Sequence, residues 1–161
     1  MLGESFCIAN ETPRLAEKFS IKFNKPLPPI LNTAGLSGQE WFGRWSDGHK
    51  VVLEVPVDMT WKGLLLKIKG ELYTPQGITS QQMSFSVHGS KVKELSVASE
   101  SEIVIHFHRE MFDDNRLELI IDLPDAVSPS KFGSADTRIL GFAFHTLEVR
   151  AVGARDIHGN K

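Results

Sequence analysis

Two glycine-punctuated segments, residues 35–48 and 128–141, combine aromatic and charged side chains. A tryptophan offers a flat apolar face that can stack on the C–H surface of a sugar ring. Arginine and carboxylate side chains form paired hydrogen bonds that fix the hydroxyl or carboxylate groups of a ligand. These residue types predict a saccharide-binding site, and the residues that we expect to form it are Trp41, Arg44, Trp45, Asp136 and Arg138.

The same residues allow a structural interpretation. Arg138 can pair with Glu40 or Asp136 and fasten a long loop to the rest of the domain, and Arg44 has the same choice of partners. The two tryptophans of the first segment would then cover one end of the core. Trp61, at the entrance to a strand, is expected in the core or at its rim.

Other side chains have the chemistry to bind a metal ion. His106 and His108 are two residues apart, so they would point to the same face of a strand, but two ligands need a third. We therefore expect an exposed pair on the wet face of a strand, opposite Ile105 and Phe107. A group of aspartates could bind calcium or simply form turns, and its members are Asp113, Asp114, Asp122 and Asp125. We therefore expect no cofactor and leave a structural calcium ion open.

The motifs of common catalytic sites are absent from the sequence. It contains no Gly-x-Ser-x-Gly elbow, no His-Glu-x-x-His pair, no phosphate-binding loop and no Gly-x-Gly-x-x-Gly fingerprint. A carboxylate pair for glycoside hydrolysis stays open, because its spacing is set in three dimensions. The sequence as a whole favours a protein that is not an enzyme.

Composition narrows the classes of partner. The 161 residues include 18 basic and 20 acidic side chains, a net charge of −2, so no strong field attracts nucleic acid. The single cysteine, Cys7, can form no internal disulfide and no cysteine-based zinc site. No apolar run approaches the ~20 residues of a membrane span, so we expect no direct membrane insertion. A free cysteine is compatible with the cytoplasm, where we expect the protein to act, or with the cell envelope if the chain is part of a larger membrane-bound enzyme.

The positions of apolar residues from about residue 50 onward alternate with a period of two, which is typical of strands with one buried face. Turn signals separate the segments, and Gly89-Ser90 predicts a hairpin between two of them. The pattern predicts an all-β fold, an antiparallel β-sandwich or jelly roll with little helix. The seven expected strands are residues 51–57, 64–73, 83–88, 92–97, 102–107, 117–123 and 139–149.

The N-terminal part has a different pattern. Residues 1–34 are expected to form an extension or an edge segment packed on the sandwich, which itself would comprise residues 35–161. Residues 19–23 alternate like an edge strand, and the prolines of residues 26–29 predict an extended crossing segment. Thr12-Pro13 could start a short helix that runs to Lys18. Open edge strands also make a homodimer conceivable.

Three ordered elements of the sequence resemble one family. They are Gly43-Arg44-Trp45-Ser46, the strand pair around Val87-His88-Gly89, and Ser128-Pro129 followed by Gly133-x-x-Asp136-x-Arg138-x-Leu140-Gly141. Over residues 35–150 the chain resembles the β-sandwich accessory domain of bacterial cell-envelope glycosyltransferases. His88 departs from the family pattern, which has asparagine there.

The resemblance implies a non-catalytic module that recognises or positions a saccharide. The ligand would be a growing or lipid-linked glycan, and a glycosyltransferase domain or chain would be the partner. The alternative is a structural, docking or oligomerisation module with no ligand of its own. Fold and fusion do not by themselves establish function, so the site has to decide between these hypotheses.

Overall fold

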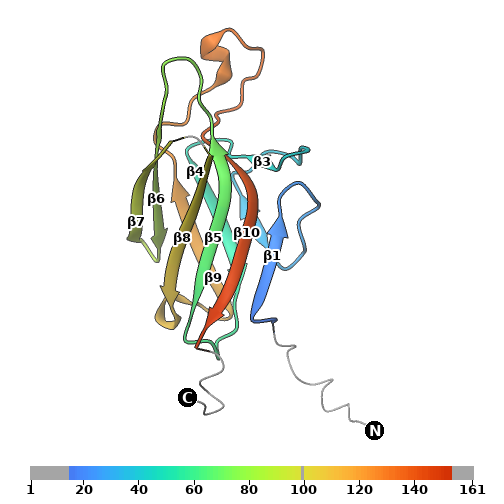
Figure 1. Cartoon of the computed structure of the whole chain (residues 1–161), viewed down its shortest axis with the longest axis vertical. Coiled ribbons are helices and arrows are strands. Elements are labelled where there is room, and N and C mark those ends of the chain that lie inside the picture. Colours follow the sequence, from blue (N-terminus) through green and yellow to red (C-terminus); the bar gives the residue numbers. More distant parts are fainter. Residues whose placement is uncertain (1–14, 99, 154–161) are drawn as a thin grey trace.

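The computed structural model describes residues 15–98 and 100–153, which form two antiparallel β-sheets packed face to face (Figure 1). Sheet A has the order β1-β10-β5-β8, with β3 also paired to β10. Its strands are β1 (Lys18–Lys22), β3 (Arg44–Trp45), β5 (Gly63–Leu72), β8 (Glu100–His108) and β10 (Phe142–Val152). Sheet B has the order β2-β4-β9-β6-β7. Its strands are β2 (Asn32–Ala34), β4 (Lys50–Pro56), β6 (Gln81–Val87), β7 (Ser90–Val97) and β9 (Arg116–Asp122).

Helical structure in the described residues is limited to two short 3₁₀ turns, η1 (Arg109–Met111) and η2 (Pro129–Phe132). The prediction of an all-β antiparallel sandwich with little helix is therefore confirmed. The described residues contain no helix long and apolar enough to cross a membrane.

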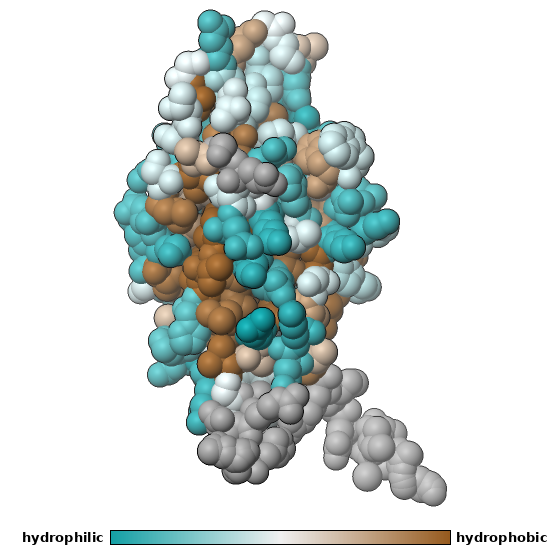
Figure 2. All heavy atoms as spheres, viewed as in Figure 1, coloured by the Kyte–Doolittle hydropathy of each residue, from teal (hydrophilic) through white to brown (hydrophobic). Residues whose placement is uncertain are grey.

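The core lies between the inner faces of the two sheets, as the alternation of apolar residues predicts. In sheet B, Leu53 of β4 is paired with Leu119 of β9, and both are fully buried. The outer positions next to these residues are mixed: Glu54 and Glu118 are polar, whereas Val52 and Ile120 are apolar and only partly buried. Figure 2 shows the molecule from the side of sheet A, where hydrophilic residues lie beside a band of hydrophobic ones. Trp61 is only 1% exposed, which confirms its expected place in the core.

All seven expected strands are present, with shifts of a few residues at their ends. The predicted hairpin is β6–β7, and its turn uses positive φ angles of 52° at His88 and 78° at Gly89. The largest boundary error is at β10, which begins at Phe142 rather than Ile139. Residues before it form an isolated bridge between Val127 and Leu140 instead of a continuous strand.

The predicted N-terminal edge strand is confirmed as β1, which lies at one edge of sheet A. Residues 23–31 then cross to β2 at the edge of sheet B, as the prolines predict. The predicted helix from Thr12 to Lys18 lies partly outside the described residues. Where it can be judged it is wrong, because residues 15–17 are not helical and Lys18 already pairs with β10. The domain division at residue 34 stays a prediction.

Candidate ligand-binding site

The two glycine-punctuated segments lie against each other, and Arg138 joins them. Its guanidinium donates to both carboxylate oxygens of Asp136, with Nη2–Oδ2 at 2.7 Å and Nε–Oδ1 at 3.1 Å. Its Nη1 also donates to Glu40 Oε2 at 3.1 Å and to Ser37 Oγ at 2.7 Å. One side chain therefore fastens residues 35–43 to the segment before β10. Of the expected site residues, the structure brings Asp136 and Arg138 into direct contact.

The contact with Arg138 changes the acidity of Asp136. Hydrogen bonds from the side chain and then the backbone N–H of Arg138 stabilise the ionised carboxylate and lower the pKa of Asp136 to about 2. The same pairing raises the pKa of Arg138 above its ordinary value. Both groups are charged throughout the physiological pH range.

A carboxyl ¹³C NMR titration should show this directly, with a midpoint of about 2 for Asp136. Replacing Arg138 with methionine should raise that midpoint toward the ordinary 3.8, because the charged donor is removed. A carboxyl whose pKa is depressed by folding adds stability above its unfolded pKa, which is lost as pH falls through the folded value. The contribution of Asp136 should therefore disappear between about pH 4 and pH 2. A wild-type midpoint near 3.8 would contradict the ion pair.

Aromatic rings form a row across the first segment. The ring centroids of Trp41 and Phe42 are 5.4 Å apart, those of Phe42 and Trp45 are 5.8 Å apart, and those of Trp45 and Tyr73 are 5.8 Å apart. Each contact is edge-to-face, a favoured arrangement for aromatic pairs. Trp45 is half-buried within this row, whereas Trp41 at its end is 86% exposed.

The turn that carries Trp41 is held from two sides. Its backbone closes on itself through Glu40 N–H to Gly43 O at 2.8 Å and Gly43 N–H to Glu40 O at 3.2 Å. Asn24 Nδ2 donates to Trp41 O at 3.3 Å, and Gln39 Nε2 donates to Asn24 O at 3.1 Å. The indole therefore projects from an ordered turn rather than from a loose loop.

Arg44 faces the polypeptide backbone. Its Nε donates to Phe23 O at 3.2 Å and its Nη2 to Lys25 O at 3.3 Å, so it fastens the start of the crossing segment to β3. The carboxylate partners expected in the structural interpretation are found for Arg138 and not for Arg44. The binding role of all five expected residues stays a prediction.

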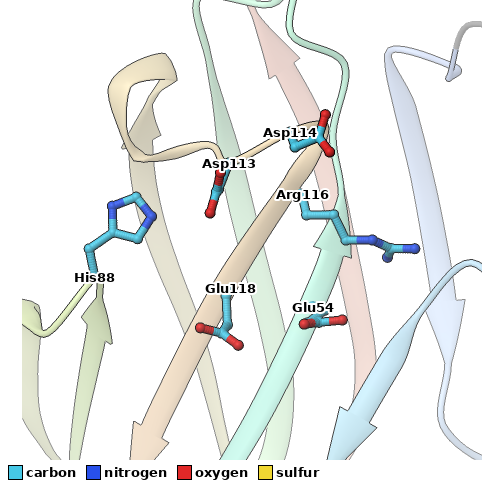
Figure 3. Close-up of a pocket in the computed structure, with 6 residues that line it drawn as sticks. All are labelled: Glu54, His88, Asp113, Asp114, Arg116 and Glu118. Carbon is cyan, nitrogen blue, oxygen red and sulfur yellow. The ribbon is translucent and has the colours of Figure 1, made fainter.

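Polar side chains also line a hollow of about 420 Å³ on the outer face of sheet B (Figure 3). Glu54 of β4 stands directly opposite Glu118 of β9 in the strand register, and the His88 ring points toward the hollow from the β6–β7 turn. Asn32 Nδ2 donates to Glu54 Oε1 at 2.9 Å. The residues that line the hollow are Glu54, His88, Asp113, Asp114, Arg116 and Glu118.

Sequence reasoning did not single out Glu54 and Glu118 as site residues. The signal was present, because both occupy outward positions of predicted strands, but which strands are neighbours was unknown. Two like charges directly opposite each other weaken the pairing of strands. The hollow is therefore a polar surface at which repulsion between two carboxylates weakens the pairing of β4 and β9.

Side chains that could bind a metal ion are not clustered in the described residues. In residues 15–98 and 100–153, no three His, Cys, Asp or Glu side chains lie close enough to hold an ion. His106 and His108 are both exposed on sheet A with ring centroids 4.7 Å apart, in agreement with an exposed pair. The expectation of no cofactor, with a structural calcium ion left open, stays a prediction.

Comparison with known proteins finds similarity only among solved structures. No protein-family model matches the chain, and no curated protein sequence matches it. It is similar to the C-terminal family 6 carbohydrate-binding module of a laminarinase from Zobellia galactanivorans, with 7% identity, a TM-score of 0.47 and coverage of 83% of this chain and 98% of the other. It is similar to a family 36 carbohydrate-binding module of a xylanase from the Trinervitermes trinervoides hindgut metagenome, with 8% identity, a TM-score of 0.47 and coverage of 82% and 95%.

An acetyl xylan esterase from Butyrivibrio proteoclasticus is also similar, with 10% identity and a TM-score of 0.49. Here 84% of this chain matches only 33% of the esterase. The assignment of the chain to the β-sandwich class rests on its own strand pairing, described above.

Proposed function

We propose that this chain is a non-catalytic saccharide-binding module and that Trp41 is its stacking surface. The observation that supports this most is the 86% exposure of a tryptophan on a turn closed by hydrogen bonds. Leaving a large apolar ring in water is unfavourable, and tryptophan is enriched at binding interfaces. Because the turn is already ordered, binding costs little conformational entropy.

Polar side chains beside Trp41 supply the hydrogen bonds that a sugar requires. Glu40 and Gln39 precede it in the same turn, and Glu40 keeps its carboxylate half-exposed while it pairs with Arg138. A sugar hydroxyl can both donate to a carboxylate and accept from an amide. The surface is shallow, so these bonds mainly replace bonds to water and the expected affinity is modest.

The glycan class follows from the sequence resemblance. Three ordered elements resemble accessory domains of cell-envelope glycosyltransferases, which supports a growing or lipid-linked glycan as ligand and a transferase as partner. The second candidate is a docking module, because an exposed tryptophan on a rigid turn can equally anchor a protein partner. Binding of isolated glycans separates the two hypotheses.

The experiment is a glycan array and affinity electrophoresis of the whole chain, beside the Trp41→Ala and Phe132→Ala variants. Phe132 is the matched control, because it is an exposed aromatic residue, 46% accessible, on the other segment. We expect Trp41→Ala to weaken glycan binding at least about tenfold, a loss of ~1.4 kcal/mol, and Phe132→Ala to leave binding unchanged.

Three results would count against the proposal. Unchanged binding in a folded Trp41→Ala variant would remove Trp41 from the site. Binding that survives Trp41→Ala and is lost in Glu118→Gln would move the site to the hollow on sheet B. A blank array with folded protein would favour the docking module.

A further inference from the structure

The four sheet edges of the sandwich differ in how they are protected against pairing with another strand. Edge strands are commonly guarded by short length, lysines, prolines or bulges. Strand β1 carries an exposed lysine at each end, and β2 has only three residues. Strand β7 carries Lys91 and Lys93, and its pairing with β6 shifts register between Phe85 and Ser86.

Strand β8 has none of these protections. It contains nine residues without a lysine or a proline, and it pairs with β5 in an unbroken register from Gly63↔His108 to Glu71↔Glu100. In the part of the chain that the structure describes, β5 is the only strand that pairs with β8. Its other side is the edge of sheet A, as Figure 1 shows. This edge is a regular template for another strand.

The hydrogen bonds show which residues of β8 face that edge. Arg109 N–H donates to Lys62 O at 3.0 Å, in line with the register of β5 and β8. Because hydrogen-bonded positions alternate along antiparallel strands, residues 103, 105 and 107 turn their backbone groups toward β5. Residues 102, 104 and 106 therefore turn their N–H and C=O groups toward the free edge. The side chains at these three positions are exposed on the outer face of sheet A.

These three side chains could pair with the same three side chains of a second β8 strand that runs antiparallel to the first. An antiparallel pair centred on Val104 would place Val104 opposite its own copy and Glu102 opposite His106 of the second copy. Val104 is 43% exposed, and it is a large apolar side chain on the outer face of β8, where its neighbours Glu102 and His106 are polar. Shifting the register by two residues would instead place Glu102 opposite Val104. The contact between the two valines and the hydrogen bond that an imidazole can donate to a carboxylate thus favour the same register.

We propose that two copies of this chain form a symmetric dimer in which the β8 strands pair antiparallel, centred on Val104. Sheet A then continues across the pair, so that the unpaired N–H and C=O groups at residues 102, 104 and 106 gain partners. This inference is independent of the saccharide-binding proposal, because it uses no residue of the Trp41 turn.

The neighbouring side chains leave room for this pairing. Glu102 Oε2 lies 3.6 Å from Lys69 Nζ and 3.8 Å from Lys67 Nζ, both on β5, so it is already positioned on the outer face. The His106 ring lies close to Gly63, which has no side chain to compete for that space. The glutamate and the histidine therefore stand on the same face and can meet their counterparts across the pair.

Sedimentation of the whole chain over a range of concentrations tests the dimer. We expect a monomer–dimer equilibrium that Val104→Lys abolishes, because the register would place two like charges directly opposite each other. Ile30→Lys is the matched control, since Ile30 is 42% exposed against 43% for Val104 and lies outside β8, in the segment between β1 and β2. A monomer at every concentration, or an equal effect of both lysine variants, would overturn the proposal.

Cross-linking tests the register. In a chain carrying Cys7→Ser, Val104→Cys should form a disulfide-linked dimer on mild oxidation, because opposed residues of this type lie about 5.5 Å apart between Cα atoms, within disulfide reach. Ser96→Cys, exposed on the protected strand β7, should stay monomeric. Equal cross-linking of both variants, or none for Val104→Cys, would overturn the pairing.

Discussion

Replacing Phe144 with alanine should lower the free energy of unfolding by about 4 kcal/mol, the range for truncating a buried aromatic residue. Phe144 is fully buried in β10, and its ring lies 5.0 Å from that of Phe142 and 5.7 Å from that of Phe23. Truncation would remove both contacts and leave a cavity where β1, β3 and β10 meet. Urea unfolding of the whole chain measures the effect.

Phe132→Ala is the control, because Phe132 is 46% exposed and should change stability by no more than about 0.5 kcal/mol. Equal stability losses in the two variants would mean that Phe144 is not the core residue that the structure describes.

Gly43→Ala should lower the free energy of unfolding by about 3 kcal/mol and should also impair ligand binding. Gly43 has a φ of 149°, and a Cβ atom there would collide with the backbone oxygen of Phe144. That oxygen belongs to a strand and cannot move without disturbing sheet A. The turn that holds Trp41 closes on Gly43, so relief of the clash should displace the indole.

Gly38→Ala is the matched control for this prediction. Gly38 lies in the same segment, and a Cβ atom there would meet nothing within 4 Å. Thermal or urea unfolding of the two variants, followed by the glycan-binding assay, measures both effects. Wild-type stability of Gly43→Ala would contradict the close approach of the turn to β10.

Much of the fold could be predicted from the sequence because its strands are amphipathic. A strand that buries one face has apolar and polar residues in alternation, and this two-residue period is visible in the sequence. The turn at Gly89 indicates a hairpin from local sequence alone. The short strands β2 and β3 were missed because two or three residues cannot display a period. Their pairing depends on β4 and β10, which lie far along the chain.

The candidate site was less accessible to such reasoning. Residue types identified the two segments, but exposure separates Trp41 from Trp45, and exposure depends on packing against Tyr73. The partners of Arg44 are backbone oxygens, which carry no sequence signal. The hollow on sheet B arises where Glu54 and Glu118 lie opposite each other on neighbouring strands. The alternation of apolar residues predicts strands but does not reveal which strands are neighbours.

The central claim, that Trp41 contacts a saccharide, is tested most directly by the indole N–H resonances of the three tryptophans in a ¹⁵N-labelled chain. Titration with a soluble oligosaccharide that is positive on the array should shift the Trp41 resonance most and leave that of the buried Trp61 in place. A saturable shift at Trp41 is the predicted result. An unmoved Trp41 resonance, with shifts at His88 and the other residues around the hollow, would contradict the claim.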